Sequence, residues 1–177
     1  LIEEAEEICQ GQIRLFGGPP VLNRVGDPVT LFPWWIYETR LHIDPVEDIK
    51  FIWEPARFGW GFVLIRAFYL TGDKKFAEYF WHCAQNFKKN NPAYFGPNWV
   101  SAQEVAIRLV ALFAGYQVFG EPAGFNDTER REWISYLVFH ARRIPITIQY
   151  ARAQNNNHLV CEALGLFIAG CCFSPFP

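Results

Sequence analysis

The chain has 177 residues and a net charge of −2, from 16 lysines and arginines against 18 aspartates and glutamates. Its length suits one core of ordinary size, and because 51% of its residues are hydrophobic it is not a disordered chain. The near-neutral balance excludes a global basic field for nucleic acid, so an anionic ligand would need a local cluster of arginines. We expect a single domain over residues 1–177 and no nucleic-acid partner.

The cysteines indicate neither a disulfide framework nor a metal site. The five of them are an odd number and lack metal-ligand spacing, and adjacent Cys171 and Cys172 could pair only with strain. The sequence also lacks the patterns of a zinc site, a phosphate-binding loop and a serine nucleophile. We therefore expect free, buried thiols and neither a metal ion nor another cofactor.

The first predicted element is an amphipathic helix over residues 1–15, whose acidic start is unlike a signal peptide. Residues 17–45, rich in prolines and aromatic residues, predict an irregular arm. The next helix begins near Pro55, which a first helical turn tolerates. Its predicted apolar stripe consists of Phe58, Phe62, Ile65 and Tyr69.

Three further helices follow, each with its own boundary signals. Gly72 ends the preceding helix, and Asp73 caps one that runs to about residue 89. The stretch SAQE at 101–104 is a capping box that opens a helix to about residue 119. A helix over about 128–150 comes next, with a kink expected at Pro145.

Three consecutive asparagines stand before the last helix, in the stretch ARAQNNNHLVCEALG. Either Asn155 or Asn156 can serve as its N-cap. Capping leaves Asn157 and His158 unexplained, with Glu162 one turn further along the same face. Glycines and Glu162 interrupt the apolar sequence that follows, so we expect a helix buried on most sides and no membrane span.

The recurrence of helix pairs predicts the architecture. Paired helices joined by short loops, at about forty-five to fifty residues per pair, are typical of an α-hairpin solenoid or toroid. No strand-like alternation is visible beyond the arm. The predicted fold class is therefore all-α, built from antiparallel helical hairpins.

Several polar residues interrupt apolar stretches and are candidates for a site. Glu104 and Arg108 lie at i and i+4 in a helix of apolar neighbours, so this pair should be partly buried. Arg57 follows Glu54 by one turn and gives a second pair of opposite charges among apolar and aromatic neighbours. Either pair could be structural or could line a site.

The stretch GPNW places Asn98 and Trp99 just before a helix. A polar group beside an aromatic ring suits sugar stacking, and a simple loop anchor would look the same. From the recurrence of such polar residues we expect one concave face to contain Arg57, Asn98, Glu104, Arg108 and His158.

Three longer stretches follow one another between about Asp48 and Pro177: DIKFIWEPARFGWGFVLIRAFYLTGDKKFAEYF, GPNWVSAQEVAIRL and NNNHLVCEALGLFIAG. In this order and at these separations they resemble the N-terminal half of the heparinase II/III-like polysaccharide lyases, a group that includes alginate lyases. The resemblance implies an incomplete α/α toroid followed by a β-sandwich. The chain, which does not begin with Met, would then be a fragment that holds the first part of the toroid and lacks the sandwich.

The resemblance also implies a chemistry. These lyases remove the C5 proton of a uronic acid and break the bond at C4, and hydrogen bonds that neutralise the uronate carboxylate stabilise the intermediate. In the family an asparagine, often with a neighbouring histidine, performs this task, which here implies catalytic roles for Asn157 and His158. The family's general base and acid, a tyrosine and a histidine, would lie downstream, so we expect the 177-residue chain alone to be inactive.

Further expectations concern the surroundings of this pair. The implied partners are an anionic polysaccharide and the remainder of the same chain, and the implied location is periplasmic or secreted. The residues expected to bind substrate are Arg57, Asn98, Trp99, Glu104, Arg108, Asn156 and Glu162.

Two other functions fit the sequence. An α/α-toroid glycoside hydrolase would need two carboxylates across a cleft, for which Glu104 with Glu162 or Glu54 could serve. A non-catalytic helical repeat module would bind sugars or proteins through exposed aromatic residues. The candidates for that role are Trp34, Trp35 and Trp99.

Overall fold

A computed structural model describes residues 1–39, 48–121 and 124–173. Within these ranges the chain is all-α, as predicted, apart from one small antiparallel sheet of β1 (Gln12–Arg14) and β2 (Pro20–Leu22). Two 3-10 helices, η1 (Pro97–Trp99) and η2 (Ile144–Thr147), connect longer elements. The α-helices are α1 (Ile2–Cys9), α2 (Trp34–Thr39), α3 (Lys50–Ala56), α4 (Gly61–Thr71), α5 (Lys75–Asn90), α6 (Ala102–Phe119), α7 (Asp127–Arg143), α8 (Ile148–Gln154) and α9 (Asn157–Phe173).

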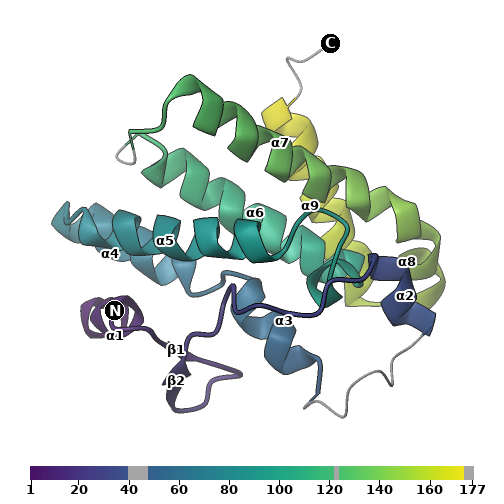
Figure 1. The fold of residues 1–177 in the computed structure, drawn as a ribbon, viewed down its shortest axis with the longest axis horizontal. Helices are drawn as coiled ribbons and strands as arrows, with labels where there is room; N and C mark the ends of the chain where they lie inside the picture. Colours follow the sequence, from purple (N-terminus) through teal and green to yellow (C-terminus); the bar gives the residue numbers. More distant parts are fainter. Residues whose placement is uncertain (40–47, 122–123, 174–177) are drawn as a thin grey trace.

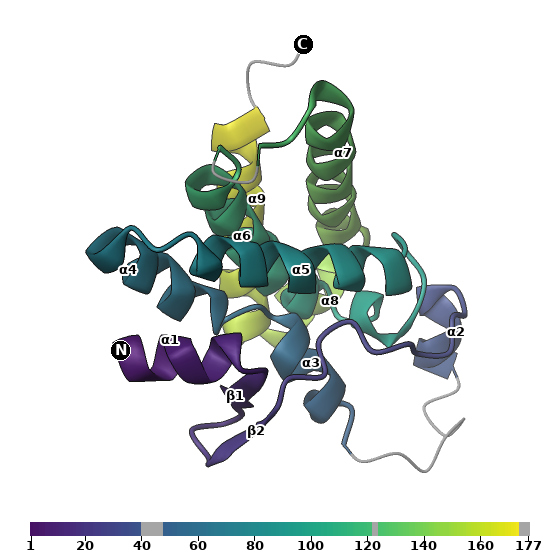
Figure 2. The ribbon, with the colours of Figure 1, turned by 60° about the vertical axis from the view of Figure 1, so that its left-hand side comes forward.

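The helices are arranged around α6, which packs against α4, α5, α7 and α9 (Figure 1). Helices α4 and α5 form one antiparallel hairpin, and α6 and α7 form another. The segment from β1 to α2 runs along one side of these helices, below α5 in the second view (Figure 2). This arrangement confirms the predicted helical hairpins. It places α6, which contains the candidates Glu104 and Arg108, at the centre of the fold.

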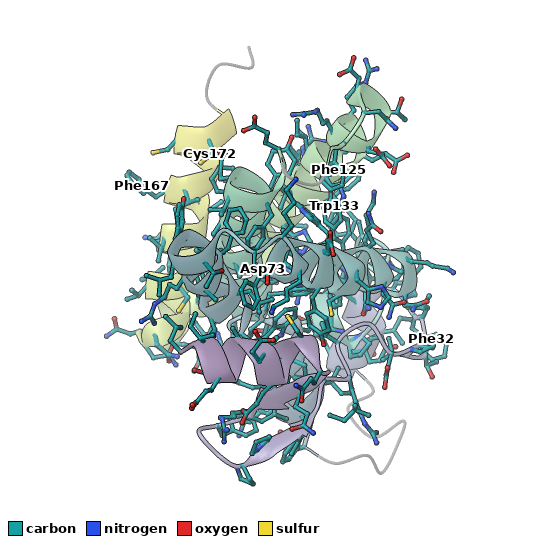
Figure 3. All side chains as sticks on the ribbon, turned by 90° about the vertical axis from the view of Figure 1, so that its left-hand side faces the viewer. Phe32, Asp73, Phe125, Trp133, Phe167 and Cys172 are labelled. Atoms are coloured by element: carbon teal, nitrogen blue, oxygen red, sulfur yellow. The ribbon has the colours of Figure 1, made fainter. Side chains whose placement is uncertain are left out.

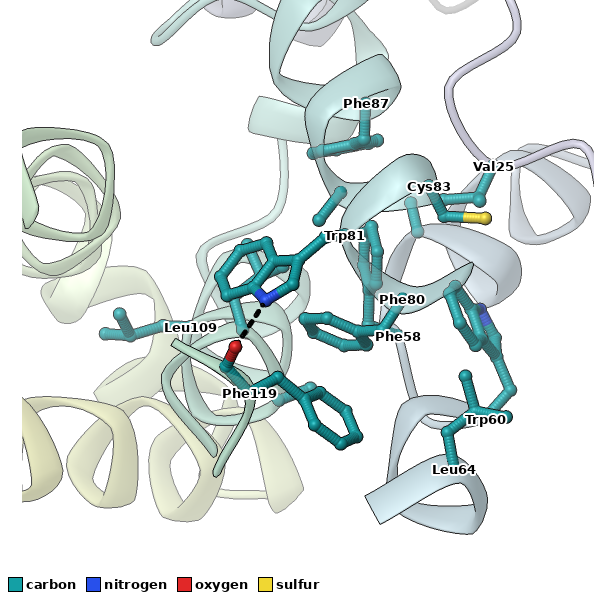
Figure 4. Packing of buried hydrophobic residues seen from close by; sticks show 14 of the residues in the cluster. Val25, Phe58, Trp60, Leu64, Phe80, Trp81, Cys83, Phe87, Leu109 and Phe119 are labelled. Carbon is teal, nitrogen blue, oxygen red and sulfur yellow. Dashed lines mark hydrogen bonds between the residues drawn. The ribbon is translucent and has the colours of Figure 1, made fainter. Parts of the chain in front are cut away.

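Aromatic rings fill the core between α4, α5 and α6 (Figure 4). The Phe80 ring lies edge-on to Phe58 at 5.9 Å between centroids and 5.3 Å from Phe119, a geometry that aromatic quadrupoles favour. Trp81 Nε1 donates a hydrogen bond to the Phe119 carbonyl at 3.0 Å. At Gly115 a Cβ atom would lie 2.1 Å from the Phe80 ring, so only glycine allows α6 to approach α5 this closely.

Several predicted boundaries are confirmed by their caps. Gly72 adopts the left-handed conformation that ends α4, with φ of 70°. Asp73 Oδ1 accepts a hydrogen bond from Lys75 N at 3.0 Å at the start of α5. Ser101 Oγ accepts one from Glu104 N at 3.4 Å, which begins α6 where the capping motif predicts it. These signals are local, and local sequence is enough to place them.

The first predicted helix, over residues 1–15, is wrong beyond its first ten residues. Gly11 has φ of 85°, which a continuing right-handed helix excludes. The chain then enters β1, whose Ile13 pairs with Val21 of β2. The predicted arm contains β2 and the short helix α2, so it is less irregular than expected, and its residues 40–45 lie outside the described ranges.

The predicted helix start at Pro55 is wrong, because Pro55 lies in the last turn of α3, which begins at Lys50. A break at Phe58 then separates α3 from α4. This residue has φ of 57°, so α3 ends and α4 begins in a new direction. The change of direction also alters the face that α4 buries, because Phe62 and Tyr69 are 41% and 72% exposed while Leu64 is buried. The predicted stripe is therefore wrong for two of its four members.

Helix 128–150 is likewise divided rather than kinked. Helix α7 begins at a capping box in which Asn126 Oδ1 accepts from the amides of Thr128 and Glu129. It ends at Arg143, and Pro145 lies in the 3-10 helix η2, which leads into α8. A proline cannot donate the hydrogen bond that would continue the helix.

The last helix, α9, buries one side only. Gly165 contacts α6 so closely that a Cβ atom there would lie 2.9 Å from Ala106 Cβ. On the other side Val160, Leu164 and Phe167 are exposed, and Figure 3 shows Phe167 at the edge of the molecule. The prediction of a helix buried on most sides is thus wrong. No helix in the described part of the chain combines the length and apolarity needed to cross a membrane.

Candidate functional site

The three asparagines before α9 have different structural roles. Asn155 ends α8 in the left-handed conformation, with φ of 47°. Asn156 Oδ1 accepts a hydrogen bond from His158 N at 2.9 Å and thereby caps α9. Asn157 is the first residue of α9, is exposed, and makes no side-chain hydrogen bond within the described residues. Capping therefore accounts for Asn156 and leaves the Asn157 amide available to a ligand.

The histidine beside Asn157 has an aromatic neighbour, Tyr150. The half-buried ring of His158 lies 6.2 Å from the exposed ring of Tyr150, at an interplanar angle of 86°. The left-handed residue Asn155 reverses the chain between α8 and α9, which brings these two rings together. No periodic pattern connects positions eight residues apart across such a turn, so this contact could not be predicted from the sequence.

A polar cluster lies beside the start of α9, where α3 meets α6. Arg57 donates from Nε and Nη2 to the two carboxylate oxygens of Glu104, at 2.6 and 2.8 Å, and from Nη1 to Glu54. The Glu104 carboxylate is nearly fully buried, and this hydrogen bonding is the main cause of a raised Arg57 pKa. The two parallel hydrogen bonds make this a bidentate arginine–carboxylate pair.

This arrangement corrects one prediction. Glu104 and Arg108 are both buried, as expected, but Glu104 pairs with Arg57 instead of with the arginine one turn along its own helix. Because its carboxylate is turned toward Arg57, Glu104 does not complete the reciprocal half of the capping box at Ser101. Glu104 therefore pairs with a residue 47 positions away in the chain and not with its i+4 neighbour.

Helix α9 brings its first turns close to this cluster. Cys161 lies within electrostatic reach of Glu104, Arg57 and Glu162, and its thiol pKa is raised, mainly by burial. Cys161 stands one helical turn after Asn157 on the same face of α9. The second turn of α9 therefore lies near the Arg57–Glu104 pair, and Asn157 stands one turn before it on the same helix.

Glu162 supplies an unusual carboxyl group to the same region. It is 1% exposed, and its Oε2 has no hydrogen-bond partner within the described residues. Burial raises its pKa, against the opposing effect of the positive charge on Arg143. A carboxyl group in such a place can hold a proton more readily than an exposed one and can then donate a hydrogen bond.

Arg108 belongs to a separate, deeply buried network. Its Nη2 donates to the Asn98 carbonyl at 2.6 Å and its Nε donates to His140 Nε2 at 3.0 Å. The guanidinium lies over the rings of Phe87 and Trp99, at 5.1 and 5.6 Å. Although burial lowers the Arg108 pKa to about 10, the side chain stays charged at neutral pH.

A second arginine completes this network around the loop before α6. Arg143 Nε donates to the Trp99 carbonyl at 3.0 Å, and Nη2 donates to the Val100 carbonyl at 2.6 Å. Together with Arg108, it binds the carbonyls of three consecutive residues, 98–100. This role of Arg143 was not predicted, because nothing in the neighbouring sequence distinguishes it from a surface arginine.

The predicted single concave face is therefore two groups. Arg57 and Glu104 lie with the start of α9, whereas Asn98 and Arg108 belong to the buried network. Arg108 and the ring of Trp99 are fully buried, so in this structure they present no surface for a sugar and hold the loop instead. Trp34 is also buried and packs under Arg143 at 3.6 Å.

A cavity of about 280 Å³ reaches Arg57 from the side of α1 and β1. Its lining includes the carboxylates of Glu4, Glu7 and Glu54 against the guanidinium groups of Arg14 and Arg57. Three negative groups against two positive ones make this lining slightly acidic, which does not favour a polyanion.

The thiols and carboxylates give no metal centre in the described ranges. The five cysteines are free, as predicted, but only Cys83 is buried. No group of three or more His, Cys, Asp or Glu side chains among the described residues could hold a metal ion.

The buried His140 predicts a pH-dependent stability. Its Nδ1 contacts the Tyr136 carbonyl at 2.8 Å and its Nε2 accepts from Arg108, so the folded protein holds it neutral. Burial, with the nearby charge of Arg108, lowers its pKa well below 6.5. The unfolded chain takes up this proton near pH 6.5, so the free energy of unfolding falls as pH drops below 6.5, by up to about 1.4 kcal/mol per pH unit.

Urea unfolding at pH 7.5, 6.5 and 5.5 measures this effect. His140→Gln keeps an acceptor for Arg108 but cannot titrate, so its stability should change less than that of the wild type over this range. Equal pH dependence of the two proteins would contradict the assignment.

A family model matches the part of the chain that contains these residues. Residues 30–177 match the family described as Heparinase II/III N-terminus. The matched range includes α2–α9, and with them the Arg57–Glu104 pair and the asparagines before α9. No curated protein and no solved structure matches the chain.

Proposed function

The chain belongs to the heparinase II/III N-terminal family, and from this premise we propose that it forms part of a polysaccharide lyase acting on uronic-acid-containing polysaccharides by β-elimination. In this proposal Asn157 and His158 bind the uronate carboxylate, and the Arg57–Glu104 pair supports the wall beside them. The partner is an anionic polysaccharide, and the location that goes with such a substrate is periplasmic or secreted.

The observation that carries the proposal is the availability of Asn157. Its neighbours Asn155 and Asn156 are used by the turn and the cap, while Asn157 has an exposed amide in the first turn of a 17-residue helix. The amino end of a helix carries partial positive charge and free N–H groups, which favour an anion there.

The reaction gives these residues a definite task. A base removes the C5 proton, the C4–O bond breaks, a C4–C5 double bond forms, and an acid protonates the leaving oxygen. Negative charge moves onto the carboxylate as the proton leaves, so donors at the carboxylate stabilise the transition state more than the ground state. Asn157 offers its NH₂ group, and His158 offers a ring N–H.

The hydrolase alternative is less well supported by the geometry. A glycosidase acid must release and regain a proton during turnover. Both oxygens of Glu104 accept hydrogen bonds from Arg57, so this carboxylate is already engaged within the protein. Glu162 is buried with a raised pKa and so resembles an acid, but a hydrolase would need a second carboxylate with it, and Glu104 is engaged by Arg57.

An ultraviolet assay on the full-length protein distinguishes the two reactions. Elimination creates a C4–C5 double bond conjugated with the carboxylate, which absorbs, whereas hydrolysis creates none. We expect absorbance to rise with uronate polysaccharides such as alginate or heparan sulfate and to stay constant with neutral glycans. New reducing ends without absorbance would support the hydrolase and contradict our proposal.

A further inference from the structure

A second cavity, of about 240 Å³, lies between the loop 24–29, helix α3 and η1. None of its lining residues comes from α9, so it is separate from the site around Asn157. Apolar side chains supply much of its wall, and a few polar groups supply the rest. The residues that matter here are Arg24, Asp27, Phe51, Ile52, Pro55 and Asn98.

The buried member of this cavity is Asn98, which is 4% exposed. The neighbouring Asn91 donates its Nδ2 to the Phe87 carbonyl at 3.2 Å, which leaves Asn91 Oδ1 as an acceptor. Asn98 must therefore present its Nδ2 to Asn91, at 2.8 Å. This chain of hydrogen bonds fixes the orientation of the Asn98 amide.

The consequence is an acceptor without a donor. Asn98 Oδ1 is buried and has no hydrogen-bond partner within the described residues. Buried oxygens are normally paired, because an unpaired one loses its hydrogen bonds to water without replacement. Because this oxygen is inaccessible to solvent in the structure, a ligand hydroxyl in the cavity would donate to it after a small shift of the Asn98 side chain.

The exposed part of the lining favours an acidic sugar. Arg24 and Asp27 make no ion pair within the described residues, so a guanidinium and a carboxylate are both available. Arg24 can pair with a carboxylate, Asp27 can accept from hydroxyls, and the half-exposed Phe51 ring offers an apolar surface for a sugar face. Because the two charges cancel, the cavity suits one acidic residue better than a run of them.

We propose that this cavity is a subsite for a single uronic acid residue, with a hydroxyl donating to Asn98 Oδ1 and the carboxylate accepting from Arg24. The choice of an acidic sugar rests on the proposed lyase function. The subsite itself rests on the unpaired oxygen and the cavity, and it would hold a glycan residue away from the bond that is cleaved.

Chemical-shift titration of the ¹⁵N-labelled chain with glucuronic acid, and with glucose as the neutral match, tests the proposal. We expect glucuronic acid to shift the amides of residues 24–27, 29, 96, 98 and 99, and glucose to bind at least about tenfold more weakly. Arg24→Gln should weaken glucuronic acid binding about tenfold and leave glucose binding unchanged. Arg66→Gln, an exposed arginine on α4 remote from the cavity lining, is the matched control and should bind like the wild type.

Each outcome decides the question. Equal binding of the two sugars, unchanged binding by Arg24→Gln, or no shifts at all would overturn the proposal and leave a cavity filled by water only. Asn98→Ser tests the buried acceptor, and if that variant does not fold the Arg24 variant still decides. Absorbance in the lyase assay without glucuronic acid binding would reject the subsite alone, and the converse result would reject the lyase function alone.

Discussion

Asn157→Ala in the full-length protein that we expect to contain this chain should lower turnover about 10²–10³-fold, or some 2.7–4 kcal/mol, with little change in substrate affinity. The lost amide donor acts mainly where charge develops, so its removal affects the rate more than binding. Since Asn156, and not Asn157, caps α9, the stability of the folded protein should be nearly unchanged. Initial rates from the ultraviolet assay and urea unfolding measure the two effects.

Asn157→Asp makes the test sharper. An aspartate has the same size as asparagine and suits a helix start, but it would place one carboxylate against another. We expect activity at least as low as that of the alanine variant. Gln154→Ala, an exposed amide at the end of α8, serves as the control and should remain active. Near-normal turnover by Asn157→Asp would end the carboxylate-binding hypothesis.

Arg108→Met should lower the free energy of unfolding by about 2–4 kcal/mol, because it leaves buried acceptors on Asn98 and His140 without donors. Methionine matches the length of the arginine stem, so the loss reflects hydrogen bonds more than volume. Arg66→Met removes an exposed arginine from α4 and should change stability by no more than about 0.5 kcal/mol.

Urea unfolding of both variants at pH 7.5 makes the comparison. Equal stability of the two would show that the Arg108 network is dispensable. In that case the deep burial of a charge would need another explanation, such as a direct contact with substrate after rearrangement of the loop before α6.

The parts of the fold that were predictable depend on neighbours in the sequence. Gly72, Ser101 and the asparagine before α9 each bind a backbone group two to four positions away, so a short stretch contains the whole interaction. The division at Phe58 was hidden for the opposite reason. A phenylalanine with positive φ is held there by packing against Phe80 and Phe87, residues of another helix.

The candidate site was predictable in composition but not in partnership. Burial of Glu104 followed from its apolar neighbours, but its pairing with Arg57 depends on the angle between α3 and α6. Trp99 looked like a sugar platform because its loop stands before a helix, and only the packing of α7 shows that His140 covers it at 4.5 Å. Residue type predicts what a side chain can do, whereas tertiary packing decides whether a ligand can reach it.

The loop before α6 differs from most loops in how its path is fixed. The carbonyls of residues 98–100 are bound by Arg108 and Arg143, side chains that belong to two different helices. Loops usually accept insertions and deletions because their backbone groups face water. Here one added or removed residue would carry three carbonyls out of register with both guanidinium groups at once. In natural variants of this domain the length of this loop should therefore stay constant even where its residues change.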